Sequence, residues 1–63
     1  MDIPVSTRLR LARGEMSRED VAVACDISVS ALSMYENGQR VPRDEIKVKL
    51  AKFYGKSVEE LFF

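Results

Sequence analysis

The stretch Asp26–Arg40, DISVSALSMYENGQR, decides the fold of this chain. Ser28 is placed to cap a helix, Leu32 and Tyr35 lie on one apolar face of that helix, and the Asn-Gly pair ends it. Four short, uncharged side chains lie on the opposite face: Val29, Ser30, Ser33 and Met34. This face has none of the Glu–Lys pairs that usually cover a helix exposed only to water. We therefore expect it to bind another molecule.

Two helices are expected before this stretch. The first follows Ser6, which can cap it, and ends at Gly14. The second follows Ser17, with Asp20 at the third helical position as a weaker form of the capping box. It is expected to end near Asp26, where a residue that tolerates left-handed backbone geometry is needed.

Two helices are also expected after it. The fourth helix carries an apolar stripe and closes at Gly55; the stripe is Ile46, Leu50, Phe53 and Tyr54. Ser57 and Glu60 form a full capping box for a short fifth helix. The remaining core candidates are Met16, Cys25, Val58, Leu61 and Phe62. No segment alternates with a period of two, so the predicted fold class is all-α.

The composition narrows the function. The 63 residues are expected to form one domain, 1–63. The charges of the 10 basic and 10 acidic residues cancel, and a net charge of zero argues mildly against a nucleic-acid binder. There is no histidine, no nucleophile beside a base and no glycine-rich phosphate loop. We therefore predict no catalytic residues, no metal, no cofactor and no enzyme activity. A single cysteine, and no apolar run or signal peptide, predict a soluble cytoplasmic protein.

The second and third helices have the spacing of a helix-turn-helix over about residues 17–37. Counted from Arg18, the fifth residue must be small because the two helices cross there, and it is Ala22. Five other positions should be apolar, and all of them are: Val21, Cys25, Ile27, Leu32 and Tyr35.

The segments SREDVAVACDISVSALSMYENGQRVP (17–42) and KLAKFYGKSVEELF (49–62) resemble the lambda-repressor/Cro-like, Xre-type helix-turn-helix regulators. The RGEMS turn and the YENG helix end are similar to those of stand-alone regulators of phages and mobile elements. The resemblance implies a compact five-helix DNA-binding domain that acts as a transcriptional regulator, with repression as the expected effect. It also implies that helix three (about 28–36) enters the major groove. The chain departs from the family at Asp26, where Gly is preferred, and at Arg18, where many members have Gln.

Site residues follow from this resemblance. The base contacts are expected from Val29, Ser30, Ser33 and Met34. The phosphate contacts are expected from Ser17, Arg18, Ser28, Asn37, Gln39, Arg40 and Arg43. Arg13 and Glu36 are expected to form an ion pair between helices one and three. An exposed pair of this kind contributes less than about 1 kcal/mol.

The expected partner is double-stranded DNA in the bacterial nucleoid, with no membrane and no small-molecule ligand. A homodimer on an inverted repeat is expected, and its contact is predicted at the C-terminal region, at Leu61, Phe62 and Phe63. The alternative is a protein-interaction module that keeps the helix-turn-helix fold without specific DNA binding. The zero net charge and the uncharged face of helix three favour this alternative.

Overall fold

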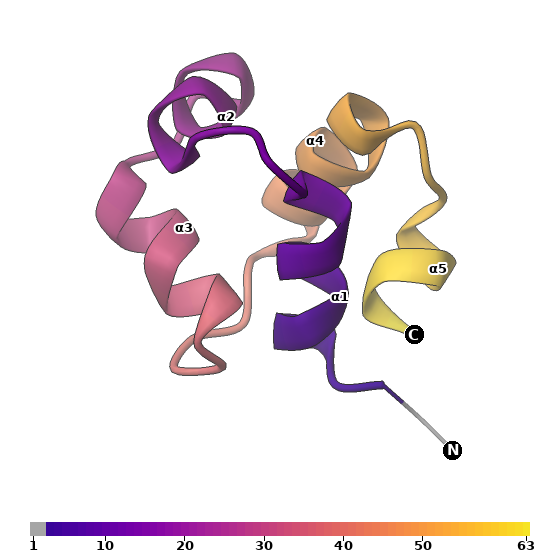
Figure 1. Cartoon of the computed structure of the whole chain (residues 1–63). Coiled ribbons are helices and arrows are strands. Elements are labelled where there is room, and N and C mark those ends of the chain that lie inside the picture. Colours follow the sequence, from indigo (N-terminus) through magenta and orange to yellow (C-terminus); the bar gives the residue numbers. More distant parts are fainter. Residues whose placement is uncertain (1–2) are drawn as a thin grey trace.

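A computed structural model describes residues 3–63 and contains five helices in that range, with no strand. They are α1 (Val5–Arg13), α2 (Arg18–Cys25), α3 (Val29–Glu36), α4 (Asp44–Tyr54) and α5 (Val58–Phe62). In Figure 1, α1 lies between α3 and α5, and it packs against both. The second helix packs on α3 and α4. The prediction of an all-α fold with five helices is confirmed.

Each helix contributes one apolar side chain that is almost completely buried. These side chains are Leu9, Val21, Leu32, Leu50 and Leu61, each with at most 1% of its surface exposed. Burying a side chain of this size stabilises a fold by about 1.5–3 kcal/mol. The five helices therefore share one core, and unfolding any one of them would expose core side chains of the others to water.

Serine caps fix the starts of α2, α3 and α5. The hydroxyls of Ser17, Ser28 and Ser57 accept hydrogen bonds from the backbone amide three residues later, at 3.0–3.1 Å. At the end of α2, Asp26 adopts the left-handed region with φ 56° and ψ 46°. The turn between α2 and α3 is therefore only three residues long, which holds α3 at a fixed angle to α2.

Three sequence-based expectations are wrong. Ser6 does not cap α1, because the helix already begins at Val5 and the carbonyl of Pro4 accepts the first helical hydrogen bond. Met16 is 41% exposed, since it lies in the loop that follows Gly14. Phe53 is also partly exposed, because Leu50, Ala51 and Tyr54 occupy the core-facing side of α4.

None of the helices described here is both long enough and apolar enough to pass through a lipid bilayer.

Candidate nucleic-acid interface

The outward face of α3 is uncharged. Val29, Ser30 and Met34 are exposed on it, while Ser33 is half-buried at its edge. The buried side of the same helix is formed by Leu32, Tyr35 and Glu36. The residues predicted to contact bases thus share one side of α3, and Val29 and Met34 are 39% and 38% exposed there.

Glu36 is the centre of a buried ionic cluster. Its side chain has no exposed surface, and its two carboxylate oxygens accept hydrogen bonds from Nε of Arg13 at 2.8 Å and Nε of Arg18 at 2.9 Å. Its backbone carbonyl accepts a further hydrogen bond from Arg10. The hydrogen bond to Glu36 raises the pKa of Arg13 above its ordinary value. The cluster ties α3 to both α1 and α2.

The predicted pair of Arg13 and Glu36 is present, but it is not the exposed pair that the sequence suggested. Glu36 is completely buried and has two arginine partners rather than one. Removing one partner from a buried ionic group leaves an unpaired charge and costs much more than losing a surface pair. The estimate of less than about 1 kcal/mol for an exposed pair therefore does not apply.

Arg10 is a member of this cluster that the sequence reasoning missed. It donates to Thr7 Oγ1 at 3.2 Å as well as to the carbonyl of Glu36. The available signal was its position three residues before Arg13, which puts both cations in the last turn of α1.

Arg18 was predicted to contact a phosphate, and the structure directs its Nε to Glu36 instead. Its side chain is still 34% exposed, and Nη1 donates to Ser33 Oγ at 3.4 Å. The amide Nδ2 of Asn37 donates to the same hydroxyl oxygen at 3.3 Å. Arg18, Ser33 and Asn37 therefore meet at one edge of α3.

The other residues predicted to contact phosphate surround α3. Ser17 and Ser28 are exposed cap residues. Gln39, Arg40 and Arg43 are exposed on the segment between α3 and α4. Within residues 3–63 neither Arg40 nor Arg43 forms an ion pair.

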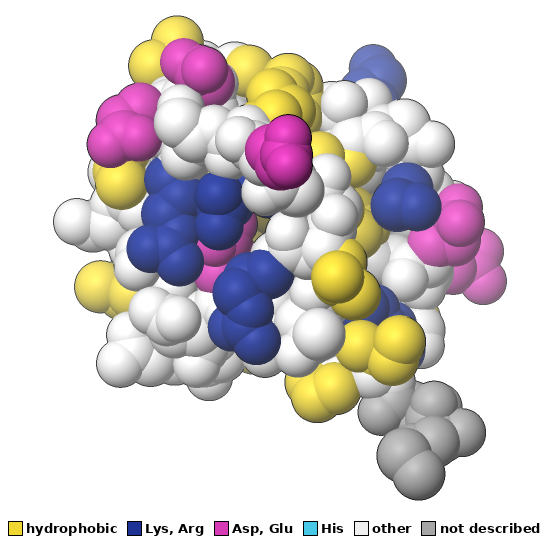
Figure 2. Space-filling model, in the orientation of Figure 1, with side chains coloured by type: hydrophobic (Ala, Val, Ile, Leu, Met, Phe, Trp, Pro, Cys, Tyr) yellow, Lys and Arg dark blue, Asp and Glu magenta, His cyan; other side chains and the backbone are white. Residues whose placement is uncertain are grey.

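Charge is unevenly distributed over the surface. Figure 2 shows Lys and Arg side chains gathered on the face where α1, α2 and α3 meet, with an acidic group between them and other acidic groups above them and at the right edge. Glu19 and Asp20 are acidic residues near this face, because they lie in the first turn of α2. A neutral chain can thus present a local basic surface.

The C-terminal residues predicted as a dimer contact are mostly inaccessible. Leu61 and Phe62 are buried in the core, which confirms their prediction as core residues and leaves them little surface for a partner. Phe63 is 77% exposed. A hollow of about 270 Å³ opens near this end of the chain, and its lining includes Tyr35, Val41, Pro42, Lys47 and Phe62.

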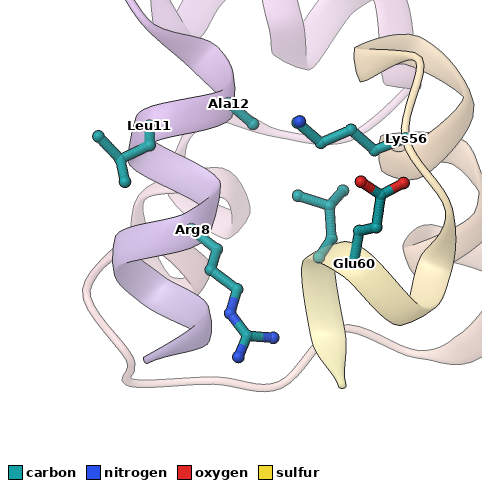
Figure 3. Close-up of a pocket in the computed structure, with 6 residues that line it drawn as sticks. Arg8, Leu11, Ala12, Lys56 and Glu60 are labelled. Carbon is teal, nitrogen blue, oxygen red and sulfur yellow. The ribbon is translucent and has the colours of Figure 1, made fainter. Parts of the chain in front are cut away.

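A second hollow, of about 240 Å³, lies between α1 and α5. Figure 3 shows Arg8 and Ala12 on α1 opposite Lys56 and Glu60. The carboxylate of Glu60 accepts a hydrogen bond from the backbone amide of Ser57, and this bond lowers its pKa. The hollow is on the other side of α1 from α3, so it is not part of the α3 surface.

Over residues 3–63, no three His, Cys, Asp or Glu side chains are grouped so that they could hold a metal ion.

Comparison with known proteins agrees with this geometry. The helix-turn-helix family model, which represents domains of the lambda-repressor, Cro and Xre type, matches residues 8–61. No curated protein and no solved structure matches the chain. The matched range includes α2, α3 and the turn between them, and it reaches into both α1 and α5. The chain belongs to the lambda-repressor/Cro/Xre-type helix-turn-helix family of DNA-binding regulators.

Proposed function

We propose that this protein is a sequence-specific transcriptional repressor that inserts α3 into the major groove of double-stranded DNA. The observation that carries the proposal is the uncharged outward face of α3, which has the donors of Arg18 and Asn37 at one edge and exposed Gln39, Arg40 and Arg43 beyond its end. Base edges in the major groove are read by short polar and apolar groups, whereas the surrounding phosphates need donors and positive charge. On this surface the short uncharged side chains lie on the outward face of α3, and the donors and cations lie at its edge and beyond its end.

Val29, Ser30 and Met34 are the proposed base contacts. Val29 and Met34 can pack on thymine methyl groups, and the Ser30 hydroxyl can donate to or accept from a base edge. None of them can form the two-bond pairing of Arg with guanine or of Gln with adenine. Direct readout is therefore modest, and part of the specificity is expected from DNA shape.

The proposed phosphate contacts lie at both ends of α3 and at the start of α2. The hydroxyls of Ser17 and Ser28 accept from backbone amides, so each retains its own proton for a phosphate oxygen. Gln39, Arg40 and Arg43 are exposed beyond the end of α3 and can reach the adjacent backbone. Arg18 and Asn37 complete the set.

We further propose a symmetric dimer that brings two copies of α3 about one helical turn of DNA, or roughly 34 Å, apart. The support is an apolar surface in which Phe63 and Val41, each 77% exposed, accompany the 270 Å³ hollow lined by Pro42 and Phe62. In a twofold interface the same patch serves both partners, so an exposed ring from one copy can fill the hollow of the other. Lys47 lies 5.1 Å from the centre of the Phe63 ring and helps to hold it in place.

The test is selection of bound sequences from a random duplex-DNA library with purified, folded protein at low salt. An enriched inverted repeat is expected, and a reporter placed behind that sequence should lose expression when the protein is produced. Arg40→Ala should then weaken binding to all sequences and reduce the salt slope by about 0.9, the value for one phosphate contact. Lys52→Ala, on the exposed side of α4, is the matched control and should leave both unchanged.

The competing function is a protein-interaction module, and the zero net charge of the chain favours it. It predicts no enriched sequence from folded protein, and no change of salt slope in Arg40→Ala.

A further inference from the structure

Ser33 makes an arrangement of hydrogen bonds that restricts what it can bind. Its Oγ accepts from Nη1 of Arg18 at 3.4 Å and from Nδ2 of Asn37 at 3.3 Å. A serine hydroxyl has two acceptor positions and one proton. Both acceptor positions are therefore occupied by groups that can only donate at these atoms. Among residues 3–63 the hydroxyl has no acceptor for its own proton, so Ser33 presents one donor to a ligand.

The position of Ser33 on α3 differs from that of Ser30 and Met34. At about 100° per residue, Ser33 is only about 60° around the helix from buried Glu36, whereas Ser30 is about 120° and Met34 about 160° away. Val29, in the first turn, is about 20° from Glu36 by the same measure. Ser33 is accordingly half-buried, and Ser30 and Met34 are exposed. Ser30 and Met34 thus point away from the protein core, while Ser33 lies at the rim of the helix beside α2.

Three arginines converge on Glu36 beside the rim. Arg13 and Arg18 bond to its carboxylate and Arg10 to its backbone carbonyl, and no other acidic side chain pairs with them in the described part of the chain. Glu36 uses its carboxylate oxygens on Arg13 and Arg18, so it holds these side chains without cancelling the charge of the whole cluster. An anion at the rim would meet the partly exposed guanidinium of Arg18, a free hydroxyl proton and the amide of Asn37, while Glu19 and Asp20 follow Arg18 on α2.

We propose that Arg18, Ser33 and Asn37 together form one phosphate-binding site, so that Ser33 contacts the DNA backbone rather than a base. The inference rests on the proposed DNA-binding function and changes the role of Ser33 within it. Arg18 Nη1 and Asn37 Nδ2 each carry a second proton besides the one given to Ser33 Oγ, so these two residues and the Ser33 hydroxyl together offer three donors at one edge of α3. Phosphate oxygens are bound by donors of this kind. Glu36 is the positioning residue behind the site, because it fixes the Arg18 side chain that faces the phosphate.

The experiment compares Ser33→Ala with Ser30→Ala on the operator obtained by selection, and both variants should fold because alanine favours helix. Ser33→Ala is expected to weaken binding by about tenfold on every sequence, the lower end for a hydrogen bond to a charged group, while the selected motif stays the same. Ser30→Ala should instead relax the preference at one base pair of each half-site.

Neutral methylphosphonate, placed at one backbone position at a time, identifies the phosphate. One position per half-site is expected to weaken wild-type binding most, and to weaken binding by Ser33→Ala or Asn37→Ala less, because each variant has already lost one of the contacts to that phosphate. A changed base preference in Ser33→Ala would overturn the proposal in favour of a base contact, and so would unchanged affinity. If the wild-type protein binds no duplex at all, the proposed function itself fails, and that result is distinct from a failure of Ser33→Ala alone.

Discussion

Replacing Glu36 by Gln should lower the free energy of unfolding by about 3 kcal/mol. The change removes the charge from a side chain with no exposed surface and weakens two hydrogen bonds, of 2.8 Å to Arg13 and 2.9 Å to Arg18. Hydrogen bonds to charged groups contribute about 1.5–3 kcal/mol each, which gives an upper range of about 3–6 kcal/mol. Since the two arginine side chains are 19% and 34% exposed, water can replace part of the lost interaction, and the lower end applies.

Urea and thermal denaturation followed by far-ultraviolet circular dichroism measure this loss. A domain of this size has a free energy of unfolding of about 3–9 kcal/mol. If the wild-type value is at the lower end, the variant should be about half unfolded without denaturant. If it is at the upper end, the variant should stay folded but unfold at a clearly lower urea concentration. Each kcal/mol corresponds to about 4–8 °C in Tm for a small domain, which predicts a decrease of at least about 12 °C.

Glu45→Gln is the matched control because Glu45 is exposed in the first turn of α4. It should change stability by less than about 0.5 kcal/mol. If Glu36→Gln also cost less than about 1 kcal/mol, the cluster would behave as a surface ion pair. The reasoning from burial would then be wrong.

Three further changes test separate features. Asp26 has a φ of 56°, in the left-handed region that glycine adopts more easily than other residues. Asp26→Gly should therefore raise stability by about 0.5–1 kcal/mol, and Asp26→Ala should lower it by about 1 kcal/mol. Equal urea midpoints for the two variants would contradict this. Tyr54→Phe should leave stability unchanged or raise it by about 1 kcal/mol, because the Tyr54 hydroxyl is buried and has no hydrogen-bond partner in residues 3–63. The same burial raises the pKa of Tyr54 to about 12. A loss of stability above about 1 kcal/mol would show that the hydroxyl forms a hydrogen bond. The pKa of Glu60 is below its ordinary value of 4.5, so its stabilising effect is present above that pH and is lost as the pH falls through the lower, folded value. The Tm difference between wild type and Glu60→Gln should therefore shrink on acidification, and a constant difference would argue against the capping box.

Most helix ends were predictable from sequence because they depend on interactions within a few residues. Ser17, Ser28 and Ser57 each cap the helix that follows, and Asp26 takes the left-handed geometry expected after α2. The exception is Ser6, a residue with the right chemistry for a cap that instead lies inside the first turn of α1. A serine can cap a helix only where the preceding backbone is not already helical.

The core was predictable where one apolar face was unambiguous. Leu32 and Tyr35 are buried as their spacing indicated. Met16 and Phe53 are exposed, because periodicity gives the side of a helix or loop but not the area that neighbouring elements cover.

By itself, the sequence determined the five helices, the short turn between α2 and α3, and the uncharged side chains on the outward face of α3. Only the tertiary structure decided which arginines bond to Glu36 beneath that face. The three arginines that bond to Glu36 are 18, 23 and 26 residues from it in the chain, on α1 and α2. The complete burial of Glu36, the turning of Arg18 toward it and the meeting of Arg18 with Ser33 all require three helices to pack together. Local sequence preferences act over about one helical turn and cannot specify contacts at that separation.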